Sequence, residues 1–300
     1  MDESATHCGY VALLGRPNVG KSTLLNHVLR QKIAITSRKP QTTRENLLGV
    51  DTDGAYQALY LDTPGIHEQE AKTSKALNSY MVNAAKSVLG DVDLRVMLAE
   101  AGRWTTQDET VAGLLRTVGK PSVLVLSKVD LVARKETLLP QMATLHERGL
   151  FEHIIPMSAL RGDGIDEFRR VVFDYLPESP HLYAPDEITD RSERALAAEI
   201  VREKLMRQLG DEIPHSAAVT IERWDERPEL VEIHAEIYVE RAGQKRIVIG
   251  NQGQRLKLIG QEARGDIERL LDRKVMLHLW VKVRKGWTND ARQLKRLGYD

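Results

Sequence analysis

Eight residues near the start of the chain have the types and the spacing needed to bind phosphate groups. Residues 15–22 read Gly-Arg-Pro-Asn-Val-Gly-Lys-Ser and fit the pattern G-x-x-x-x-G-K-S. Gly15 and Gly20 let the backbone turn so that successive N–H groups point at anionic oxygens. We expect Lys21 to reach the β- and γ-phosphates of a nucleotide and the Ser22 hydroxyl to bind Mg²⁺. The loop is completed by Arg16, Pro17, Asn18 and Val19.

The segments on either side of this loop supply the context that a phosphate site needs. Residues 10–14 read as a short buried strand, and residues 22–29 read as a helix with one apolar stripe. The helix adds the positive end of its dipole to the loop. A glycine turn followed by a chance Lys-Ser pair is the alternative, and the flanking strand and helix argue against it.

Two further segments carry the oxygen ligands and the glycine that a nucleotide switch requires. Residues 37–44 are polar and without periodicity, so they should form a loop from which the Thr43 hydroxyl completes the Mg²⁺ shell. An apolar strand ends at Asp62, which we expect to act on Mg²⁺ through a water molecule. The N–H of Gly65 can then donate to the γ-phosphate. The other expected nucleotide contacts of this segment are Thr63, Pro64 and Ile66.

A later segment has the chemistry to select guanine. An apolar strand at 122–126 is followed by Ser-Lys-Val-Asp at 127–130. The carboxylate of Asp130 can accept from both the N1–H and the 2-amino group of guanine, a pair of donors that adenine lacks. Backbone N–H groups after the last apolar strand can donate to the 6-oxo group. The expected base-binding residues are Ser127, Lys128, Val129, Asp130, Ser158 and Ala159.

Strand and helix signals alternate through this half of the chain. The alternation predicts an α/β domain with a mostly parallel sheet and helices on both faces. Arg95 interrupts the apolar strand 91–99 and fits it only if its side chain faces outward near the edge of the sheet. Residues 106–109, Thr-Gln-Asp-Glu, read as a capping box that opens a helix.

The length and the composition of the chain limit its number of domains and the class of protein to which it can belong. Three hundred residues suit two domains, and 42% hydrophobic with 29% charged residues is the composition of an ordinary soluble protein. The formal net charge is zero, so any nucleic-acid surface must be local. The single cysteine, Cys8, provides no disulfide framework and fits a reducing cytosol. We expect neither a signal peptide nor a membrane span, which needs about 20 apolar residues.

A proline-rich stretch at 179–190 predicts a linker between one domain at 1–178 and another at 191–300. The second domain reads as a helix, two strands, two helices joined around Gly250 and Gly253, a third strand and a final short helix. A lone G-x-x-G carries little weight. In this order of elements it looks like the loop of a type II KH domain, an α+β module that binds RNA. A tight helix–helix turn is the alternative.

The residues that we expect to contact RNA surround this loop. Its middle residues are neutral, so positive charge must come from nearby lysines and arginines. The last strand alternates, and one of its faces carries Trp280 and Lys282. Such a face suits stacking on unpaired bases, although a solvated outer face is the alternative. The full set is Lys245, Arg246, Gly250, Asn251, Gln252, Gly253, Arg255, Lys257, Trp280 and Lys282.

The four nucleotide motifs resemble those of the GTPases of the translation-factor class. The loop at 15–22 and the Gln-Thr-Thr-Arg segment at 41–44 narrow the resemblance to the Era family, and with the KH-like half it covers nearly the whole chain. The chain departs from the family at one position, because the family has Asn-Lys-x-Asp where this chain has Ser127. We expect this serine to keep only part of the asparagine's bridge to the phosphate loop, through a water molecule.

The resemblance implies a GTP-hydrolysing switch with Mg²⁺ that binds GTP or GDP. Its implied partners are the small ribosomal subunit, whose assembly it assists, and the 3′ end of the ribosomal RNA of that subunit. It implies a monomer in the cytoplasm with peripheral association with the inner membrane. Ile66 stands where many GTPases have a water-orienting glutamine, so intrinsic hydrolysis should be slow. The implied catalytic residues are Asn18, which would also help to hold a K⁺ ion, Lys21, Thr43 and Gly65.

Two other functions stay open from the residues alone. One is an RNA-binding protein whose nucleotide site is structural and catalytically weak, and Lys21 and Asp62 argue against it. The other is an ATP-using kinase or ATPase, in which Asp130 would have no explanation.

Overall fold

The computed structural model describes residues 5–37, 42–65, 88–119, 121–209 and 217–296. These residues form two compact units. The first consists of residues 5–34, 43–65 and the described residues up to 190, and the second consists of residues 35–37, 42 and the described residues from 191 onward. The predicted boundaries at 178 and 190 stay a prediction. Among the described residues, no helix combines the length and the apolar character needed to cross a membrane.

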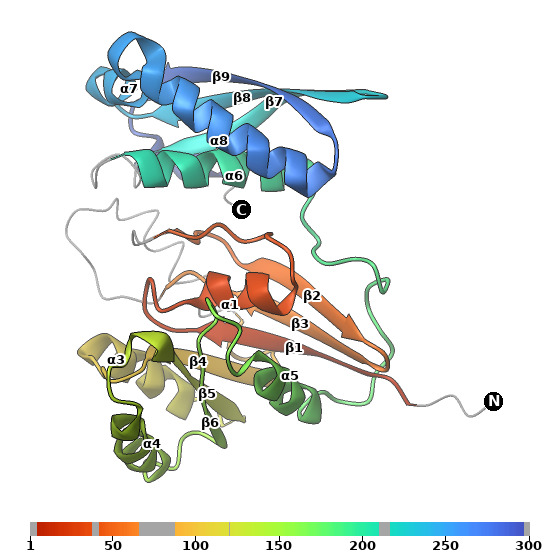
Figure 1. Cartoon of the computed structure of the whole chain (residues 1–300), viewed down its shortest axis with the longest axis vertical. Coiled ribbons are helices and arrows are strands. Elements are labelled where there is room, and N and C mark those ends of the chain that lie inside the picture. Colours follow the sequence, from red (N-terminus) through yellow and green to blue (C-terminus); the bar gives the residue numbers. More distant parts are fainter. Residues whose placement is uncertain (1–4, 38–41, 66–87, 120, 210–216, 297–300) are drawn as a thin grey trace. The chain divides into compact units, whose positions relative to one another are not determined.

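The first unit contains a sheet of six described strands in the order β2-β3-β1-β4-β5-β6 (Figure 1). All neighbouring pairs are parallel except β2 and β3, which are antiparallel. The predicted mostly parallel sheet is confirmed. The strands are β1 (His7–Leu14), β2 (Leu47–Asp53), β3 (Tyr56–Asp62), β4 (Leu94–Glu100), β5 (Ser122–Ser127) and β6 (His153–Pro156).

Helices cover both faces of this sheet, as predicted. Helices α3 (Thr106–Arg116) and α4 (Leu138–His146) pack in one buried cluster with alternate residues of β1, β4 and β5. Helices α1 (Lys21–Val28) and α5 (Ile165–Asp174) contact each other and β3. The 3₁₀ turns η1 (Val129–Leu131) and η2 (Lys135–Thr137) follow β5.

Two local predictions in this unit are wrong. The capping box of α3 uses Thr105 rather than Thr106, because Thr105 Oγ1 accepts from Asp108 N at 3.3 Å and Asp108 Oδ2 accepts from Thr105 N at 2.9 Å. Arg95 does not face outward near an edge, because β4 lies between β1 and β5 and the residue is fully buried. No guanidinium nitrogen of Arg95 has a hydrogen-bond partner among the described residues.

The proline-rich stretch at 179–190 is hydrogen-bonded to the outer strands of the sheet. Val50 N in β2 donates to Ile188 O at 2.9 Å, and Gln57 Nε2 in β3 donates to Tyr183 O at 2.9 Å. Thr189 Oγ1 also donates to Leu48 O in β2 at 2.7 Å. Since β2 is an edge strand, the bonds to Val50 N and Leu48 O satisfy backbone groups of β2 that would otherwise remain open for pairing.

The second unit has a sheet of three described strands in the order β7-β8-β9, with β7 and β8 antiparallel and β8 and β9 parallel. Its order of elements is the predicted one. The elements are α6 (Glu193–Gln208), β7 (Ala218–Arg227), β8 (Leu230–Val239), α7 (Ala242–Ile249), η4 (Asn251–Gly253), α8 (Gln254–Leu271), β9 (Lys274–Val283), η5 (Trp287–Asn289) and α9 (Ala291–Arg296).

Strict alternation along β8 gives this sheet one buried face. Val231, Ile233 and Ile237 are fully buried and pack in one cluster with residues of α6 and α8. Glu232, His234 and Glu236, which alternate with the buried positions, are only half-buried, as period-two alternation requires. Figure 1 shows α6 and α8 lying against the same side of this sheet.

Phe168 on α5 provides a test of packing in the first unit. Its side chain is fully buried, and its ring stacks on that of Tyr60 with centroids 6.1 Å apart. We expect Phe168→Ala to lower the free energy of unfolding by about 3–5 kcal/mol because it leaves a cavity. Leu139→Ala, at a side chain that is 71% exposed, is the matched control. Equal shifts of the two urea midpoints would contradict this role of Phe168.

Candidate functional site

The residues expected to bind nucleotide gather at one edge of the first sheet. Strands β1, β3, β4 and β5 are parallel neighbours, so their carboxyl ends meet. The phosphate-binding loop follows β1, Asp62 ends β3, Glu100 ends β4 and Ser127 ends β5. This edge is where open α/β sheets hold their ligands.

The phosphate-binding loop needs glycine at both predicted positions. Gly15 has φ +145° and Gly20 has φ +116°, a region that side chains disfavour. A Cβ at Gly15 would also lie 2.6 Å from Leu98 O. Asn18 adopts the left-handed conformation as well, with φ 61°. The loop therefore owes its shape to residue types that tolerate positive φ.

Lys21 is held inside this loop by backbone carbonyls. Its Nζ donates to Gly15 O at 3.1 Å and to Arg16 O at 3.3 Å, and the residue is 6% exposed. Burial lowers the pKa of Lys21 to about 8, although the charge of Asp62 acts in the opposite direction. A bound phosphate would supply the negative charge that favours the ammonium form.

The three predicted Mg²⁺ residues converge. Ser22 Oγ lies 3.0 Å from Thr43 Oγ1 and donates to Asp62 Oδ2 at 2.6 Å. Thr43 Oγ1 donates to the same Asp62 oxygen at 3.3 Å. These contacts join α1, the loop before β2 and the end of β3 at one point.

This arrangement fits a hard divalent cation. In octahedral Mg²⁺ sites with bonds of about 2.0–2.1 Å, neighbouring ligand oxygens lie about 3.0 Å apart, and the hydroxyls of Ser22 and Thr43 have this separation. Asp62 is fully buried, and its Oδ1 has no hydrogen-bond partner among the described residues. Burial raises the pKa of Asp62 while Lys21 lowers it, so a nearby cation would stabilise the carboxylate.

The segment after β3 lies against the phosphate-binding loop. Thr63 Oγ1 donates to Leu13 O at 2.8 Å, which fixes the end of β3 to β1. A Cβ on Gly65 would lie 2.7 Å from Pro17 N, so only glycine allows this approach. Pro64 lies between these two residues. Ile66 lies outside the described residues.

The expected base-binding residues also come together. Asp130 Oδ1 accepts from Ser158 Oγ at 2.6 Å, and Val129 N donates to Met157 O at 3.2 Å. Lys128 has φ 59°, which turns the chain at the end of β5. Asp130 and Ala159 are half-buried, so the Asp130 carboxylate stays accessible to a ligand. Their roles toward guanine stay a prediction.

Ser127 contacts the phosphate-binding loop directly rather than through water. Its Oγ lies 2.7 Å from Val19 O and 3.1 Å from Ala99 O, and the residue is buried. The serine therefore keeps a bridge to the loop, but the prediction that this bridge runs through a water molecule is wrong. The β5 end comes close enough to the loop for the short hydroxyl to reach its backbone, which local sequence does not reveal.

Glu100 and Asp108, which were not predicted as site residues, form ion pairs at this edge of the sheet. Arg16 Nη2 lies 2.6 Å from Glu100 Oε2, and Arg16 Nε lies 3.3 Å from Asp108 Oδ1. Lys128 Nζ lies 3.5 Å from the same Glu100 oxygen. Burial alone would raise the pKa of Glu100, but the bond from Arg16 and the charge of Lys128 lower it. The position of Glu100 at the end of β4 is the signal that could have found it.

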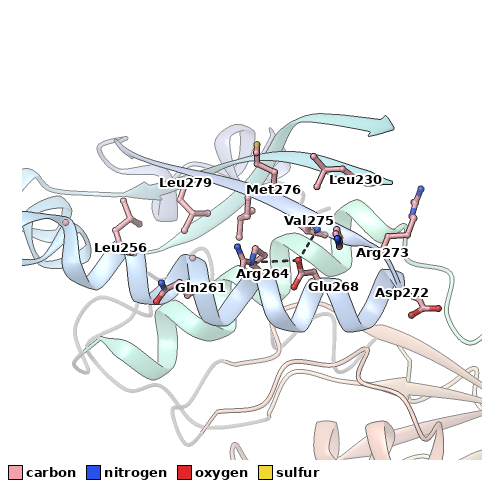
Figure 2. Close-up of a pocket in the computed structure, with 15 residues that line it drawn as sticks. Leu230, Leu256, Gln261, Arg264, Glu268, Asp272, Arg273, Val275, Met276 and Leu279 are labelled. Carbon is pink, nitrogen blue, oxygen red and sulfur yellow. Dashed lines mark hydrogen bonds and ion pairs between the residues drawn. The ribbon is translucent and has the colours of Figure 1, made fainter. Parts of the chain in front are cut away.

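The second unit holds a groove between α8 and β9 (Figure 2). Its volume is about 1040 Å³. Gly253 at the loop end and Lys257 on α8 line it, together with apolar side chains. Gly260 on α8 lines it as well, and a Cβ there would make an ordinary contact of 3.4 Å with Leu279 Cδ1. Its apolar lining consists of Leu230, Leu256, Val275, Met276, Leu277 and Leu279.

The G-x-x-G loop lies at one end of this groove and has the expected conformation. Gly250 and Gly253 have φ 75° and 78°, and Gln252 between them has φ 48°. No atom of the described residues lies within 4 Å of a Cβ built on Gly253, so a ligand backbone can approach it. Arg255 Nη1 donates to Ile247 O at 2.8 Å and so caps α7.

The structure does not bring all the predicted RNA contacts together. Asn251, Gln252, Arg246 and Lys257 are exposed around the loop, and Lys245 is half-buried. Trp280 and Lys282 do not line the groove. They alternate with the buried Val281 on β9 and therefore lie on the outer face of the sheet.

Ser127 also yields a prediction. Because its hydroxyl reaches Val19 O directly, Ser127→Ala should leave that carbonyl without this partner and cost roughly 0.5–1.5 kcal/mol of GDP binding, up to about tenfold in affinity. Ser127→Asn should gain little, since the bridge already exists. Preference for guanine over adenine should not change in either variant. Calorimetric titration with GDP measures these effects, and a tenfold gain in Ser127→Asn would show that the serine contact is inadequate.

Comparison with known families identifies both units. A model for the 50S ribosome-binding GTPase family matches residues 10–128, and a KH domain model matches residues 212–288. The GTPase Era of Pseudomonas fluorescens strain Pf0-1 is 51% identical over 99% of this chain and 98% of its own length. That of Marinobacter nauticus is 52% identical over 98% of this chain and 95% of its own length.

Solved structures agree with these sequence matches. A crystal structure of Era in complex with MgGDPNP and nucleotides 1506–1542 of 16S ribosomal RNA is 40% identical to this chain. The match has a TM-score of 0.93 and covers 98% of this chain and 99% of that one. The chain thus has a GTPase domain followed by a KH domain, and it belongs to the Era family of GTPases.

Proposed function

We propose that this GTPase is a switch that binds the 3′ end of small-subunit ribosomal RNA and assists assembly of the small ribosomal subunit. The observation that carries the proposal is the convergence of Ser22, Thr43 and Asp62, in a chain that also has a G-x-x-G groove. The Era structure described above holds a Mg²⁺-bound nucleotide and 16S ribosomal RNA nucleotides together.

The nucleotide half of the proposal assigns each residue a role. The N–H groups of the loop at 15–22 and the Lys21 ammonium bind the β- and γ-phosphates. Ser22 and Thr43 hold Mg²⁺ and Asp62 acts through water, and the ion neutralises charge on the phosphate oxygens. Gly65 donates its N–H to the γ-phosphate. Asp130 accepts from guanine and Ala159 donates its N–H to the 6-oxo oxygen. Ser158 acts through its hydroxyl, which donates to Asp130, because its own N–H already donates to Asp163 O at 3.0 Å.

Switching follows from loss of the γ-phosphate. The backbone N–H groups of Thr43 and Gly65 bind the γ-phosphate, which only the triphosphate presents, so hydrolysis removes the contacts that hold their segments in place. The close approach of Gly65 to the phosphate-binding loop supports this role. Slow hydrolysis from Ile66 and K⁺ binding by Asn18 stay predictions of the family resemblance, as do a monomeric state and association with the inner membrane.

The RNA half of the proposal uses the groove of the second unit. The open face of Gly253 lets a phosphate approach the backbone, and the apolar floor beside it accepts unstacked bases. Lys257 and Arg246 supply local positive charge in a chain whose net charge is zero. Trp280 and Lys282 stay a prediction on the outer face of the sheet.

Membership of a GTPase family argues against the two alternative functions. A structural nucleotide site would have no use for the convergence of hydroxyls on Asp62, and an ATP enzyme would have no use for Asp130. Release of phosphate in a single turnover and failure of excess ATP to displace GTP test these two points.

Lys21→Ala tests the nucleotide site. The variant should lose tight GTP binding, because no other side chain of residues 15–22 brings a positive charge into the loop interior; the Arg16 guanidinium instead pairs with Glu100 and Asp108. Fluorescence titration with a labelled GTP analogue measures the loss. Lys135→Ala, at an exposed lysine of η2, is the control. Unchanged GTP affinity in Lys21→Ala would refute the proposed switch.

Acidic substitution of the G-x-x-G loop tests the RNA groove. Asn251→Asp combined with Gln252→Asp should repel phosphate and weaken binding of a single-stranded oligonucleotide with the 16S 3′-end sequence. GTP hydrolysis without RNA should not change. Binding of the unmodified protein should also weaken as salt rises. Glu136→Gln, far from the groove in sequence, is a charge-changing control. Equal RNA affinity in the double variant and the parent would exclude the loop as the binding surface.

A further inference from the structure

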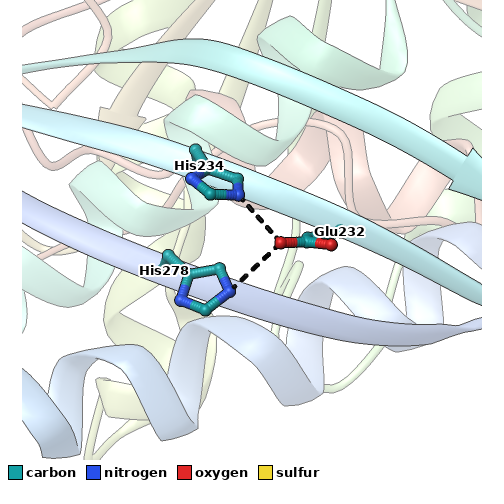
Figure 3. A group of neighbouring side chains, drawn as sticks. All are labelled: Glu232, His234 and His278. Atoms are coloured by element: carbon teal, nitrogen blue, oxygen red, sulfur yellow. Dashed lines mark hydrogen bonds and ion pairs between the residues drawn. The ribbon is translucent and has the colours of Figure 1, made fainter.

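Three potential metal ligands lie together on the outer face of the second unit's sheet (Figure 3). Glu232 and His234 are two residues apart on β8, so they project from the same face. His278 pairs with His234 in the parallel register of β8 and β9. Since Val231 and Ile233 are fully buried on the opposite face, the cluster must face outward.

The three ligand atoms have separations that suit a metal ion. His234 Nε2 lies 3.0 Å and His278 Nε2 lies 3.5 Å from Glu232 Oε1. All three atoms lie within 4.8 Å of one another. Around tetrahedral Zn²⁺ with bonds of about 2.0–2.2 Å, neighbouring ligands are about 3.3–3.5 Å apart. An ion therefore fits between these atoms after a small shift of the imidazoles.

Neighbouring side chains hold the ligands in this arrangement. The Trp280 ring stacks on that of His234, with centroids 5.1 Å apart and planes at 11°, and its centroid lies 5.7 Å from that of His278. Arg227 Nη2 lies 2.9 Å from Glu232 Oε2, so Oε1 remains directed at the imidazoles. These contacts fix the orientation of the Glu232 carboxylate and of the His234 ring.

We propose that Glu232, His234 and His278 form a binding site for a first-row transition-metal ion of the Zn²⁺ type. Two imidazoles and one carboxylate favour Zn²⁺ over Mg²⁺, which prefers oxygen ligands alone. Three protein ligands leave one tetrahedral position for water. The His278 side chain is 40% exposed, so an ion can enter from solvent. None of the three ligands belongs to the nucleotide site or lines the groove between α8 and β9.

Metal titration of the full chain tests this site. Excess Mg²⁺ and GDP first saturate the nucleotide site, and Zn²⁺ is then titrated against a chromophoric chelator. We expect one Zn²⁺ per chain at low micromolar concentration, and visible Co²⁺ absorption bands typical of four-coordinate geometry. Absence of stoichiometric Zn²⁺ binding would overturn the proposal.

Substitutions locate the ion. His278→Ala and His234→Ala should each weaken Zn²⁺ binding by more than about 100-fold, since loss of a supporting contact alone costs about 10–100-fold. His278→Cys should retain binding, because a thiolate is also a Zn²⁺ ligand. His146→Ala, at an exposed histidine of α4, is the control. Equal Zn²⁺ affinity in the parent and His278→Ala would show that the ion binds elsewhere and would overturn the proposal.

Discussion

A buried carboxylate at the end of β3 is the constraint on which the nucleotide site depends. Asp62 is fully buried, and burial raises its pKa, so its charged form needs donors or a cation nearby. Lys21 and the hydroxyls of Ser22 and Thr43 meet part of that need. The other carboxylate oxygen of Asp62, Oδ1, has no hydrogen-bond partner among the described residues. These residues therefore do not fully stabilise the charged carboxylate. Electrostatics therefore favours the assembly of a cation site where three segments meet.

A second set of contacts connects the phosphate-binding loop with the segment after β5, which is predicted to bind the base. The Ser127 hydroxyl bonds to Val19 in the phosphate-binding loop, and Glu100 pairs with both Arg16 and Lys128. These contacts cross from β1 through β4 to β5, and all of them lie at the same edge of the sheet. The separation between the phosphate-binding loop and the segment after β5 is thus set by the spacing of the parallel strands that hold them.

The second unit uses the two faces of one small sheet for different chemistry. Alternation along β8 buries Val231 and Ile233 against helices and turns Glu232 and His234 outward. On the helical side, the gap between α8 and β9 forms an apolar groove that begins at the G-x-x-G loop. The outer face has a polar and aromatic surface centred on Trp280. An apolar groove and a separate cluster of two histidines and a glutamate therefore lie in one domain without sharing side chains.

Local patterns in the sequence by themselves determined the order of the elements, the phosphate-binding loop and the G-x-x-G loop, because glycine conformation and hydrophobic period depend only on near neighbours in the chain. The remaining contacts were decided by which strands lie beside each other, and this depends on residues that are far apart in the chain. The arrangement of the strands buried Arg95 in a central strand, brought Glu100 to Arg16, and allowed the short Ser127 side chain to reach a backbone carbonyl 108 residues away. It likewise set His278 opposite a histidine 44 positions earlier, because only the register of β8 and β9 decides which side chains meet across them.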